Sequence, residues 1–454
     1  MAPEKFKPYT LSTIRETAYW RKLSEEAREA VAIVSQVLPF RINEYVMREL
    51  IDWSNIPDDP IFRLTFPHRD MLLEEEYAAL YDLYFVRQDK LALDKRVDSI
   101  RRRMNPHPAG QMTSNVPTLH GKLLRGIQHK YKQTVLFFPG AGQTCHAYCT
   151  FCFRWPQFVD METLKFSANE SDDLVAYLKQ HPEVTDVLIT GGDPMVMNAR
   201  SLARYIEPLL APDLDHIQNI RIGTKSLAYW PQRFVSDGDA DDVLRLFERV
   251  VQSGKQLAVM GHYSHSVELV PDVARLAVKR ILSTGATLRM QSPVIRHVNN
   301  DSKIWEALWM DGAKLGAIPY YMFVERDTGP RHYFEISLAN ALDIFRTSYL
   351  GVSGLARTAR GPSMSIHAGK VVIEGVATIG NEQVFVLQFL QARNQDWVRK
   401  PFFAKFDSTA VWFDDLVPAF GQKRFFFQND ETPSFQKIDF NENASRKTSL
   451  ETLS

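Results

Sequence analysis

The chain has 454 residues, enough for one large domain or two, and its 54 lysines and arginines balance its 54 aspartates and glutamates. A net charge of zero argues against a nucleic-acid-binding surface and against binding to anionic membranes. No apolar stretch approaches the roughly 20 residues that span a bilayer, and the N-terminus has no apolar signal core, so we expect a cytoplasmic protein.

Residues 1–125 are predicted to form an N-terminal helical region. Apolar residues recur with a spacing near 3.6 over residues 25–38 and again over residues 71–104, with charged residues between them. Each of these two runs predicts an amphipathic helix.

Residues 126–350 alternate short β-rich runs with amphipathic helical patterns, such as those at 172–180, 242–252 and 273–283. Six units of this kind in series predict an α/β fold with a parallel sheet, curled into a full or partial barrel. Side chains that carry chemistry lie at the carboxyl ends of the strands in such folds. The predicted strands are 135–139, 186–190, 217–224, 257–263, 287–294 and 319–324.

Residues 351–430 form a third segment, with strand-like patterns at 370–379 and 383–390 and many aromatic residues after 390. These aromatics could cap the mouth of the barrel, form a subunit contact or add to the core, and core packing is the favoured interpretation. Residues 431–454 are polar, which predicts a disordered tail.

All three cysteines of the chain, Cys145, Cys149 and Cys152, follow the first predicted strand with the spacing C-x3-C-x2-C. Three thiols can each bind one iron of a 4Fe–4S cluster and leave the fourth iron open. S-adenosylmethionine (SAM) can chelate an open iron, and a reduced cluster can cleave it to a 5′-deoxyadenosyl radical. A four-ligand zinc site, disulfides and buried structural thiols fit this odd-numbered cluster less well.

The loop Gly191-Gly192-Asp193-Pro194 directly follows the second predicted strand. Glycines let a backbone come close to a ligand, so this loop could receive the amino group of SAM, although such a motif alone is more often a turn. Arg154 lies two residues after Cys152 and could hold a carboxylate, the alternative being a surface arginine.

Three further side chains stand at positions that a pocket would use. His262 lies near the end of the fourth predicted strand and Gln291 on the fifth, where we expect His262 to form hydrogen bonds, and Gln291 to face the pocket or only pack. Lys370 follows the sequence His-Ala-Gly and could form a Schiff base, although a lone lysine is more often a surface charge.

Together these residues resemble the lysine 2,3-aminomutase family of radical SAM enzymes. The similarity runs from roughly residue 40 to 390 and rests on the blocks 145–154, 188–194, 221–224, 231–233, 261–265, 291–301, 319–321 and 353–370. It implies a partial (βα)6 barrel, a 4Fe–4S cluster, SAM and pyridoxal 5′-phosphate (PLP). The activity it implies is migration of an amino group between adjacent carbons of an amino acid through a PLP aldimine. It also implies an electron donor of the reductase or flavodoxin type, and leaves a homo-oligomer open.

The resemblance implies a role for each matching residue. Cys145, Cys149 and Cys152 would be the cluster ligands, and Arg154 would hold the substrate carboxylate. Lys370 would be the Schiff-base lysine. The residues implied for cofactor binding, besides Lys370, are Gly191, Gly192, Asp193, His262 and Gln291.

The chain departs from the family where lysine-specific members use two aspartates to hold the substrate's side-chain ammonium. Arg326 occupies the first position, or Asp327 if the alignment slips by one, and Ser363 occupies the second. Because Arg326 would repel a cation, free lysine is not the expected substrate, and Arg326, Arg357 and Arg360 favour a side chain that carries a carboxylate.

Two other departures concern PLP and assembly. Thr134 replaces an arginine that lies near the PLP phosphate in the family, although Lys130 is close by, and no cysteine follows residue 152 to form the extra zinc site of some members. The first leaves open a PLP-independent radical SAM enzyme that abstracts hydrogen from an anionic substrate. A non-catalytic iron–sulfur electron-transfer module is the third alternative.

Overall fold

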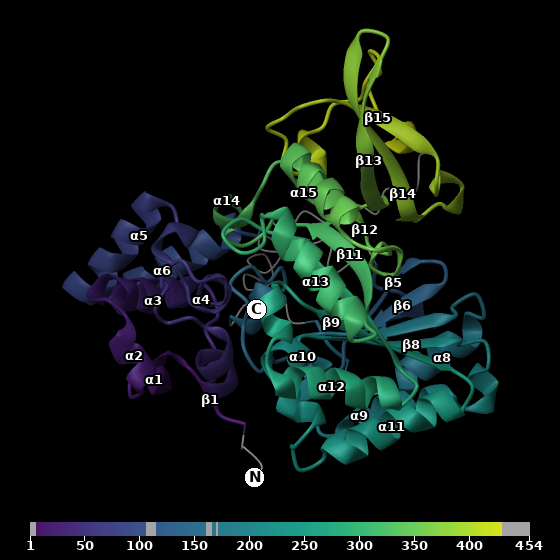
Figure 1. Ribbon diagram of the computed structural model, residues 1–454, viewed down its shortest axis with the longest axis horizontal. Coiled ribbons are helices and arrows are strands. Elements are labelled where there is room, and N and C mark those ends of the chain that lie inside the picture. Colours follow the sequence, from purple (N-terminus) through teal and green to yellow (C-terminus); the bar gives the residue numbers. More distant parts are fainter. Residues whose placement is uncertain (1–5, 106–114, 160–165, 169–170, 429–454) are drawn as a thin grey trace, which may run out of the picture.

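The structure is a computed structural model that describes residues 6–105, 115–159, 166–168 and 171–428. The tail at 431–454, predicted to be disordered, lies outside these residues. Figure 1 shows a helical group built from the N-terminal part of the chain beside a body of strands and helices. No helix in the described ranges is long and apolar enough to cross a membrane.

Most of the elements in residues 6–105 are helices. Helix α3 begins after Ser24, whose side chain accepts a hydrogen bond from the backbone N–H of Ala27, and two glutamates in its first turn favour this helix end. The predicted run 71–104 is two helices and not one, because Asp89 caps a new helix start. The elements are β1 (Pro8–Tyr9), α1 (Leu11–Ile14), α2 (Ala18–Lys22), α3 (Glu25–Val37), β2 (Ile42–Asn43), α4 (Pro60–Thr65), α5 (Glu74–Tyr81) and α6 (Lys90–Arg103).

A single sheet of eleven strands organises the rest of the described chain. The six predicted strands are all present as β6 to β11 and lie side by side in chain order, each parallel to the next. The strands are β5 (Ile127–Tyr131), β6 (Thr134–Phe137), β7 (Asp186–Ile189), β8 (Asn219–Thr224), β9 (Gln256–His262), β10 (Thr287–Val294), β11 (Ile318–Val324), β12 (Arg360–Ser365), β13 (Gly369–Ile379), β14 (Glu382–Ala392) and β15 (Pro401–Lys405). A small hairpin of β3 (Thr118–Leu119) and β4 (Lys122–Leu123) lies apart from this sheet.

Helices connect the parallel strands, which is the arrangement that the alternating sequence pattern predicts. They are α8 (Asp172–Gln180), α9 (Ala199–Ile206), α10 (Ser226–Tyr229), α11 (Ala240–Gln252), α12 (Asp272–Ser283), α13 (Ser302–Lys314), α14 (Arg331–Phe334) and α15 (Leu338–Gly351). The strand order begins at β5 and ends at β15, which are not neighbours, so the described sheet is open. Its curl into a partial barrel stays a prediction.

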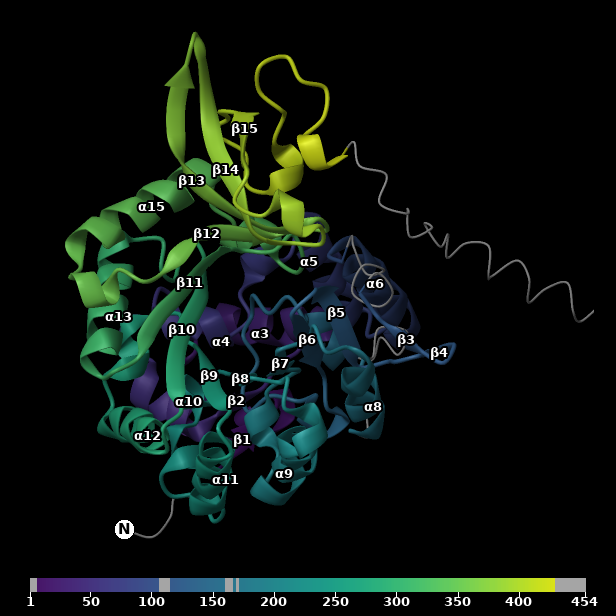
Figure 2. The same cartoon turned by 90° about the vertical axis from the view of Figure 1, so that its right-hand side faces the viewer.

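The C-terminal segment continues the same sheet. Strand β12 is parallel to β11, and β13, β14 and β15 then follow in antiparallel order. Figure 2 shows the hairpin of β13 and β14 extending beyond β12. Several aromatic residues after 390 are buried in a second core, namely Trp397, Phe402, Trp412, Phe413, Phe425 and Phe427. This confirms the core-packing interpretation.

The N-terminal region contacts the loop that carries the cysteines. The backbone N–H of Tyr148 donates to the carbonyl of Arg41 at 2.9 Å, and that of Thr150 donates to the carbonyl of Leu64 at 2.9 Å. The loop after β6 is therefore held between the N-terminal helices and the carboxyl ends of the parallel strands.

Candidate active site

The three cysteines lie in the loop after β6, all partly buried and all free of disulfides. The guanidinium of Arg41 donates to the Thr144 hydroxyl at 2.8 Å and to the carbonyl of Cys145 at 3.1 Å. The N–H of Cys152 donates to the carbonyl of Cys149 at 3.0 Å, which forms a tight turn. The loop geometry thus depends on a residue outside the motif.

The three thiols are chemically suited to an iron–sulfur cluster. Burial raises the pKa of Cys149 to about 12 and that of Cys152 to about 11. Burial also raises the pKa of Cys145, and the neighbouring Cys152 and Cys149 raise it further. Thiolates at these positions therefore need positive charge, which iron supplies. In the described ranges no three Cys, His, Asp or Glu side chains surround a point where one metal ion could bind. The ligands of a cubane bind different irons and lie further apart than the ligands of one ion.

The Gly191-Gly192 loop at the end of β7 lies directly on the cysteine loop. The N–H of Gly192 donates to the carbonyl of Gly142 at 3.0 Å. A Cβ on Gly192 would lie 2.4 Å from the carbonyl oxygen of Thr144, and one on Gly191 would lie 2.3 Å from the side-chain nitrogen of Gln143. The glycines therefore allow close approach of two protein segments. Their contact with SAM stays a prediction.

Asp193 is buried, and its carboxylate is bonded within the protein. It accepts hydrogen bonds from the Thr224 hydroxyl at 2.7 Å, the Lys225 N–H at 2.9 Å and the Met195 N–H at 2.9 Å, and His146 Nε2 lies 3.0 Å away. Burial opposes ionisation, but the bonds from His146, Thr224 and Lys225 outweigh it and lower the pKa of Asp193 below its usual value. Asp193 thus ties the ends of β7 and β8 to the cysteine loop, whatever it contributes to SAM.

Arg154 is a partly buried cation at the edge of the cysteine loop. Its guanidinium donates to Gln143 Oε1 at 3.0 Å and lies 4.4 Å from the centre of the Phe138 ring. Its Nε has no hydrogen-bond partner among the described residues, and burial lowers its pKa to about 10. A desolvated guanidinium with an unused donor is suited to an anionic ligand.

Lys370 lies near the start of β13, opposite Ser365 of β12, which places it at the carboxyl end of β12. Its ammonium lies 4.0 Å from the centre of the Tyr321 ring, and none of the described acidic side chains forms an ion pair with it. Burial, followed by the charges of Arg360 and Arg221, lowers the pKa of Lys370 to about 7. A lysine in this state is nucleophilic near neutral pH.

Further cations surround Lys370 and link it to the cysteine loop. Burial lowers the pKa of Lys130 to about 7, and the nearby charges of Arg393, Arg326 and Lys370 act in the same direction. The guanidinium of Arg326 lies 5.3 Å from the centre of the Phe153 ring, in the cysteine loop, and its buried Nε lacks a hydrogen-bond partner in the described parts of the chain.

Arg393 was not predicted as a site residue. Its Nε donates to the carbonyl of His367 at 2.8 Å, and its N–H to the carbonyl of Ala368 at 2.9 Å. Arg393 reaches this position because β14, which ends just before it, pairs with β13. A single basic residue late in the sequence does not predict that pairing.

The remaining predicted residues divide into two groups. His262, the last residue of β9, is in register with Gln291 inside β10. The His262 ring lies 5.6 Å from that of Phe151, and burial lowers the pKa of His262 well below the usual value. Ser363 is buried on β12, with its hydroxyl 3.5 Å from the carbonyl of Met322. His262 therefore lies at the strand edge beneath the cysteine loop, and Ser363 lies on β12, the strand that pairs with the start of β13.

Arg357, in contrast, does not belong to this site. It is exposed, and its guanidinium donates to the carbonyls of Val352 at 2.7 Å and Leu350 at 3.1 Å, at the end of α15. The expectation that it favours an anionic substrate is wrong, because it precedes β12 and binds the helix end. Arg360, inside β12, does contact the Tyr321 ring beside Lys370, at 4.2 Å.

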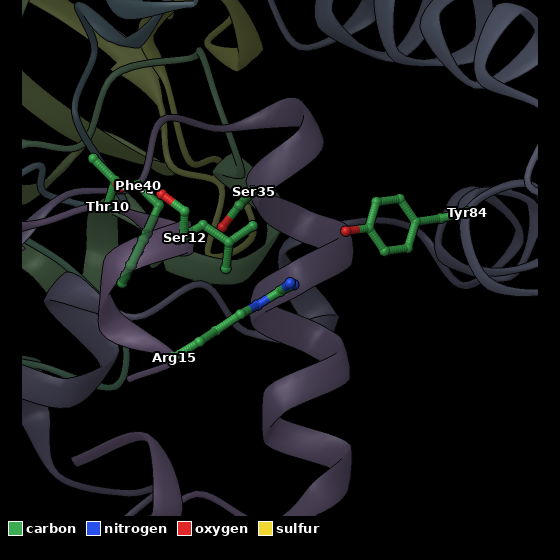
Figure 3. A pocket seen from close by; sticks show the side chains of 7 residues that line it. Thr10, Ser12, Arg15, Ser35, Phe40 and Tyr84 are labelled. Carbon is green, nitrogen blue, oxygen red and sulfur yellow. Dashed lines mark hydrogen bonds between the residues drawn. The ribbon is translucent and has the colours of Figure 1, made fainter. Parts of the chain in front are cut away.

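A separate hollow of about 400 Å³ lies in the N-terminal region (Figure 3). It is lined by Thr10, Leu11, Ser12, Arg15, Ser35, Phe40 and Tyr84. None of the predicted site residues lines it, so the site at the strand edge is distinct from this hollow.

Comparison with known proteins places this chain among aminomutases. No family model matches the sequence. A protein of Aquifex aeolicus (strain VF5) named "Putative L-lysine 2,3-aminomutase" is 30% identical over 408 residues, which are 90% of this chain and 95% of that protein. An L-lysine 2,3-aminomutase of Bacillus subtilis (strain 168) is 25% identical over 69% of this chain and 56% of that protein. A glutamate 2,3-aminomutase of Clostridioides difficile (strain 630) is 24% identical over 56% of this chain and 54% of that protein.

Among solved structures, SuiB of Streptococcus suis aligns with 64% of this chain at 14% identity and a TM-score of 0.37, too low to support an argument. The sequence relatives are more informative, because the similarity to the Aquifex aeolicus protein spans nearly the whole length of both proteins. The protein is a radical SAM enzyme of the isomerase class. It belongs to the lysine 2,3-aminomutase family.

Proposed function

We propose that this enzyme moves an amino group between adjacent carbons of an amino acid whose side chain carries a carboxylate. A 4Fe–4S cluster bound by Cys145, Cys149 and Cys152, SAM and PLP would assist. The observation that carries this proposal is the placement of the cysteine loop, Arg154 and Lys370 at one edge of the sheet. When bound, the cluster and SAM supply a 5′-deoxyadenosyl radical, and PLP supplies a covalent carrier for the amino group.

The surroundings of Lys370 support PLP. Its amine is available near neutral pH, and Lys130 and Arg393 lie nearby as cations for a phosphate group. Lys130 lies close in the sequence to Thr134, where the family has an arginine. The ammonium of Lys130 donates to the carbonyl of Ile366, four residues before Lys370. Phosphate binding by two or more cations with free donors is strong and geometrically specific.

The charges at the site support an anionic side chain over lysine. Arg154 has a free donor for the α-carboxylate, and Arg326 has one that could receive a second carboxylate. Glu325 and Asp327 offset the burial of Arg326 only in part, since its pKa remains below the usual value. A lysine side chain would instead bring a second positive charge beside the guanidinium of Arg326. The relation to a glutamate 2,3-aminomutase agrees with this choice, although most of the named relatives act on lysine.

The test is turnover by anaerobically reconstituted protein with PLP, SAM and a reductant, using glutamate and lysine separately. We expect a β-amino product from glutamate and little from lysine, with Lys370→Ala inactive. Good turnover of lysine without turnover of glutamate would contradict the proposed substrate class. Borohydride trapping and peptide mapping check the PLP site directly, since a pyridoxyl group should be found on Lys370.

A PLP-independent enzyme acting on an anionic substrate is the second candidate, favoured by the replacement at Thr134. SAM cleavage without any pyridoxyl group on Lys370 would select it. We also propose a flavodoxin-type or reductase-type electron donor, a cytoplasmic location and no nucleic-acid or membrane partner. Homo-oligomerisation is a further proposal, to be checked by the mass of the holoenzyme in solution.

A further inference from the structure

A buried ion pair between Lys225 and Glu268 lies below the cysteine loop. Lys225 follows β8 directly, and Glu268 belongs to a short helical turn (Ser266–Leu269) after β9. Lys225 Nζ lies 2.8 Å from Glu268 Oε1 and 3.2 Å from the Ser264 hydroxyl, while the other oxygen of Glu268 accepts the N–H of Ser264 at 2.6 Å. Lys225 is 8% exposed and Glu268 0%, so both charges are removed from solvent and fixed by hydrogen bonds.

Two sets of contacts connect this pair to the cysteine loop. The N–H of Lys225 donates to the same oxygen of Asp193 that lies 3.0 Å from His146 Nε2, and His146 follows Cys145. At the other end of the loop, the ring of Phe151 lies 5.6 Å from that of His262, whose carbonyl is 3.4 Å from Lys225 Nζ. Lys225 therefore lies beneath the segment that contains all three thiols.

The ammonium of Lys225 and the ring of Tyr229 lie next to each other beneath the cysteine loop. Burial raises the pKa of the Cys149 thiol, and the charge of Lys225 is the largest influence that opposes this rise. Tyr229, whose ring centre is 4.3 Å from Lys225 Nζ, has a fully buried hydroxyl without a hydrogen-bond partner in the ranges that the structure describes. Burial and then Cys149 raise the pKa of that hydroxyl. The Tyr229 ring centre also lies 6.2 Å from that of His146, the residue after Cys145, so a positive charge and an unused O–H donor both lie beside the cysteine loop.

We propose that Lys225, held in place by Glu268, sets the reduction potential of the cluster bound at Cys149. Reduction adds one electron from the donor protein to the cluster, and no proton or bond at Lys225 changes. A fixed ammonium near a thiolate ligand stabilises the reduced cluster and raises its potential, because burial weakens the screening of its charge. The inference rests on the proposed cluster and concerns how readily that cluster is reduced.

The test is a reductive titration of the reconstituted holoenzyme, followed by the EPR signal of the reduced cluster. In Lys225→Met we expect the reduction equilibrium to fall about tenfold, which is about 59 mV for one electron. In Glu268→Gln the ammonium loses its counter-ion, so we expect a shift in the opposite direction. Shifts of the reduction potential in opposite directions distinguish electrostatic control from a general disturbance of the fold. Such a disturbance would not depend on the sign of the charge that is lost.

Lys255→Met is the matched control. Lys255 is also a buried lysine, but its ammonium donates to the carbonyls of Leu214 at 3.0 Å and Ile217 at 2.7 Å, and it precedes β9 at the opposite edge of the sheet. We expect an unchanged potential there, and one close to the wild type in Lys225→Arg, which keeps the charge. Iron content is measured first in every variant.

Equal potentials in wild type, Lys225→Met and Glu268→Gln would overturn the inference and leave the proposed function standing. Shifts of both variants in the same direction would also overturn it. If Lys225→Met takes up no cluster, an unchanged potential in Glu268→Gln decides against the inference and a positive shift decides for it. A wild-type protein that binds no iron would overturn the proposed function itself, and with it this role for Lys225.

Discussion

The ammonium of Lys370 lies 4.0 Å from the centre of the Tyr321 ring, and the guanidinium of Arg360 contacts the same ring at 4.2 Å. With a pKa of about 7, about half of Lys370 is free amine at pH 7, against under about one in a thousand for an ordinary lysine. We predict that the rate of PLP attachment, measured by borohydride trapping and mass mapping, rises with pH up to about 7 and is constant above it. A rate still rising steeply at pH 9 would show an ordinary lysine.

Arg360→Met should move that pH midpoint upward. Burial is the largest cause of the lowered pKa of Lys370, and the charge of Arg360 comes next, so its removal relieves one repulsion and raises the pKa. The rate of trapping should therefore level off at a higher pH than in the wild type. Arg346→Met, an exposed change on α15, is the control and should leave the profile unchanged. A downward shift in Arg360→Met would contradict the assigned cause.

Gly192→Ala should release the cluster while the rest of the fold persists. The new Cβ would lie 2.4 Å from the carbonyl oxygen of Thr144 and 2.7 Å from its nitrogen, and backbone atoms cannot move aside as a flexible side chain does. Strain of roughly 1–3 kcal/mol would be relieved by displacing the cysteine loop. Iron and sulfide per chain should fall while the circular dichroism is retained. Gly238→Ala, where a Cβ meets nothing within 4 Å, should bind iron normally.

The sequence predicts the strands and the edge at which the motifs meet, since alternation defines β6 to β11 and parallel strands bring their carboxyl ends together. It does not predict which residues surround a given side chain. Asp193 takes its hydrogen bonds from segments around residues 146 and 224, and Arg393 arrives through a hairpin. Arg357 and Arg360 are three residues apart, yet one caps a helix end and the other lies beside Lys370, because β12 begins only at Arg360.

Asp193→Asn should destabilise the protein more than the loss of a surface charge does. The carboxylate accepts bonds from several donors in a site that is 2% exposed, and an amide group there would turn its own N–H atoms toward those donors. We expect the free energy of unfolding to fall by roughly 2–4 kcal/mol, measured by urea denaturation of the apoprotein. Asp94→Asn, on the exposed face of α6, should change it by less than about 0.5 kcal/mol. Equal stabilities of the two variants would show that Asp193 does not hold the strand ends together.

Arg326→Met should weaken the binding of an anionic amino acid without affecting reduction of the cluster. The guanidinium lies 5.3 Å from the centre of the Phe153 ring, and its buried Nε is unpartnered in the described ranges, so a carboxylate bound there would gain a charge-assisted hydrogen bond that methionine cannot donate. Such a bond contributes about 1.5–3 kcal/mol, so KM for glutamate should rise roughly 10–100-fold. Arg200→Met, exposed on α9, is the matched control. If Arg326→Met instead lowers KM for glutamate, or leaves it equal to that of the control, Arg326 does not receive the substrate's side-chain carboxylate, and the anionic substrate class loses its principal support.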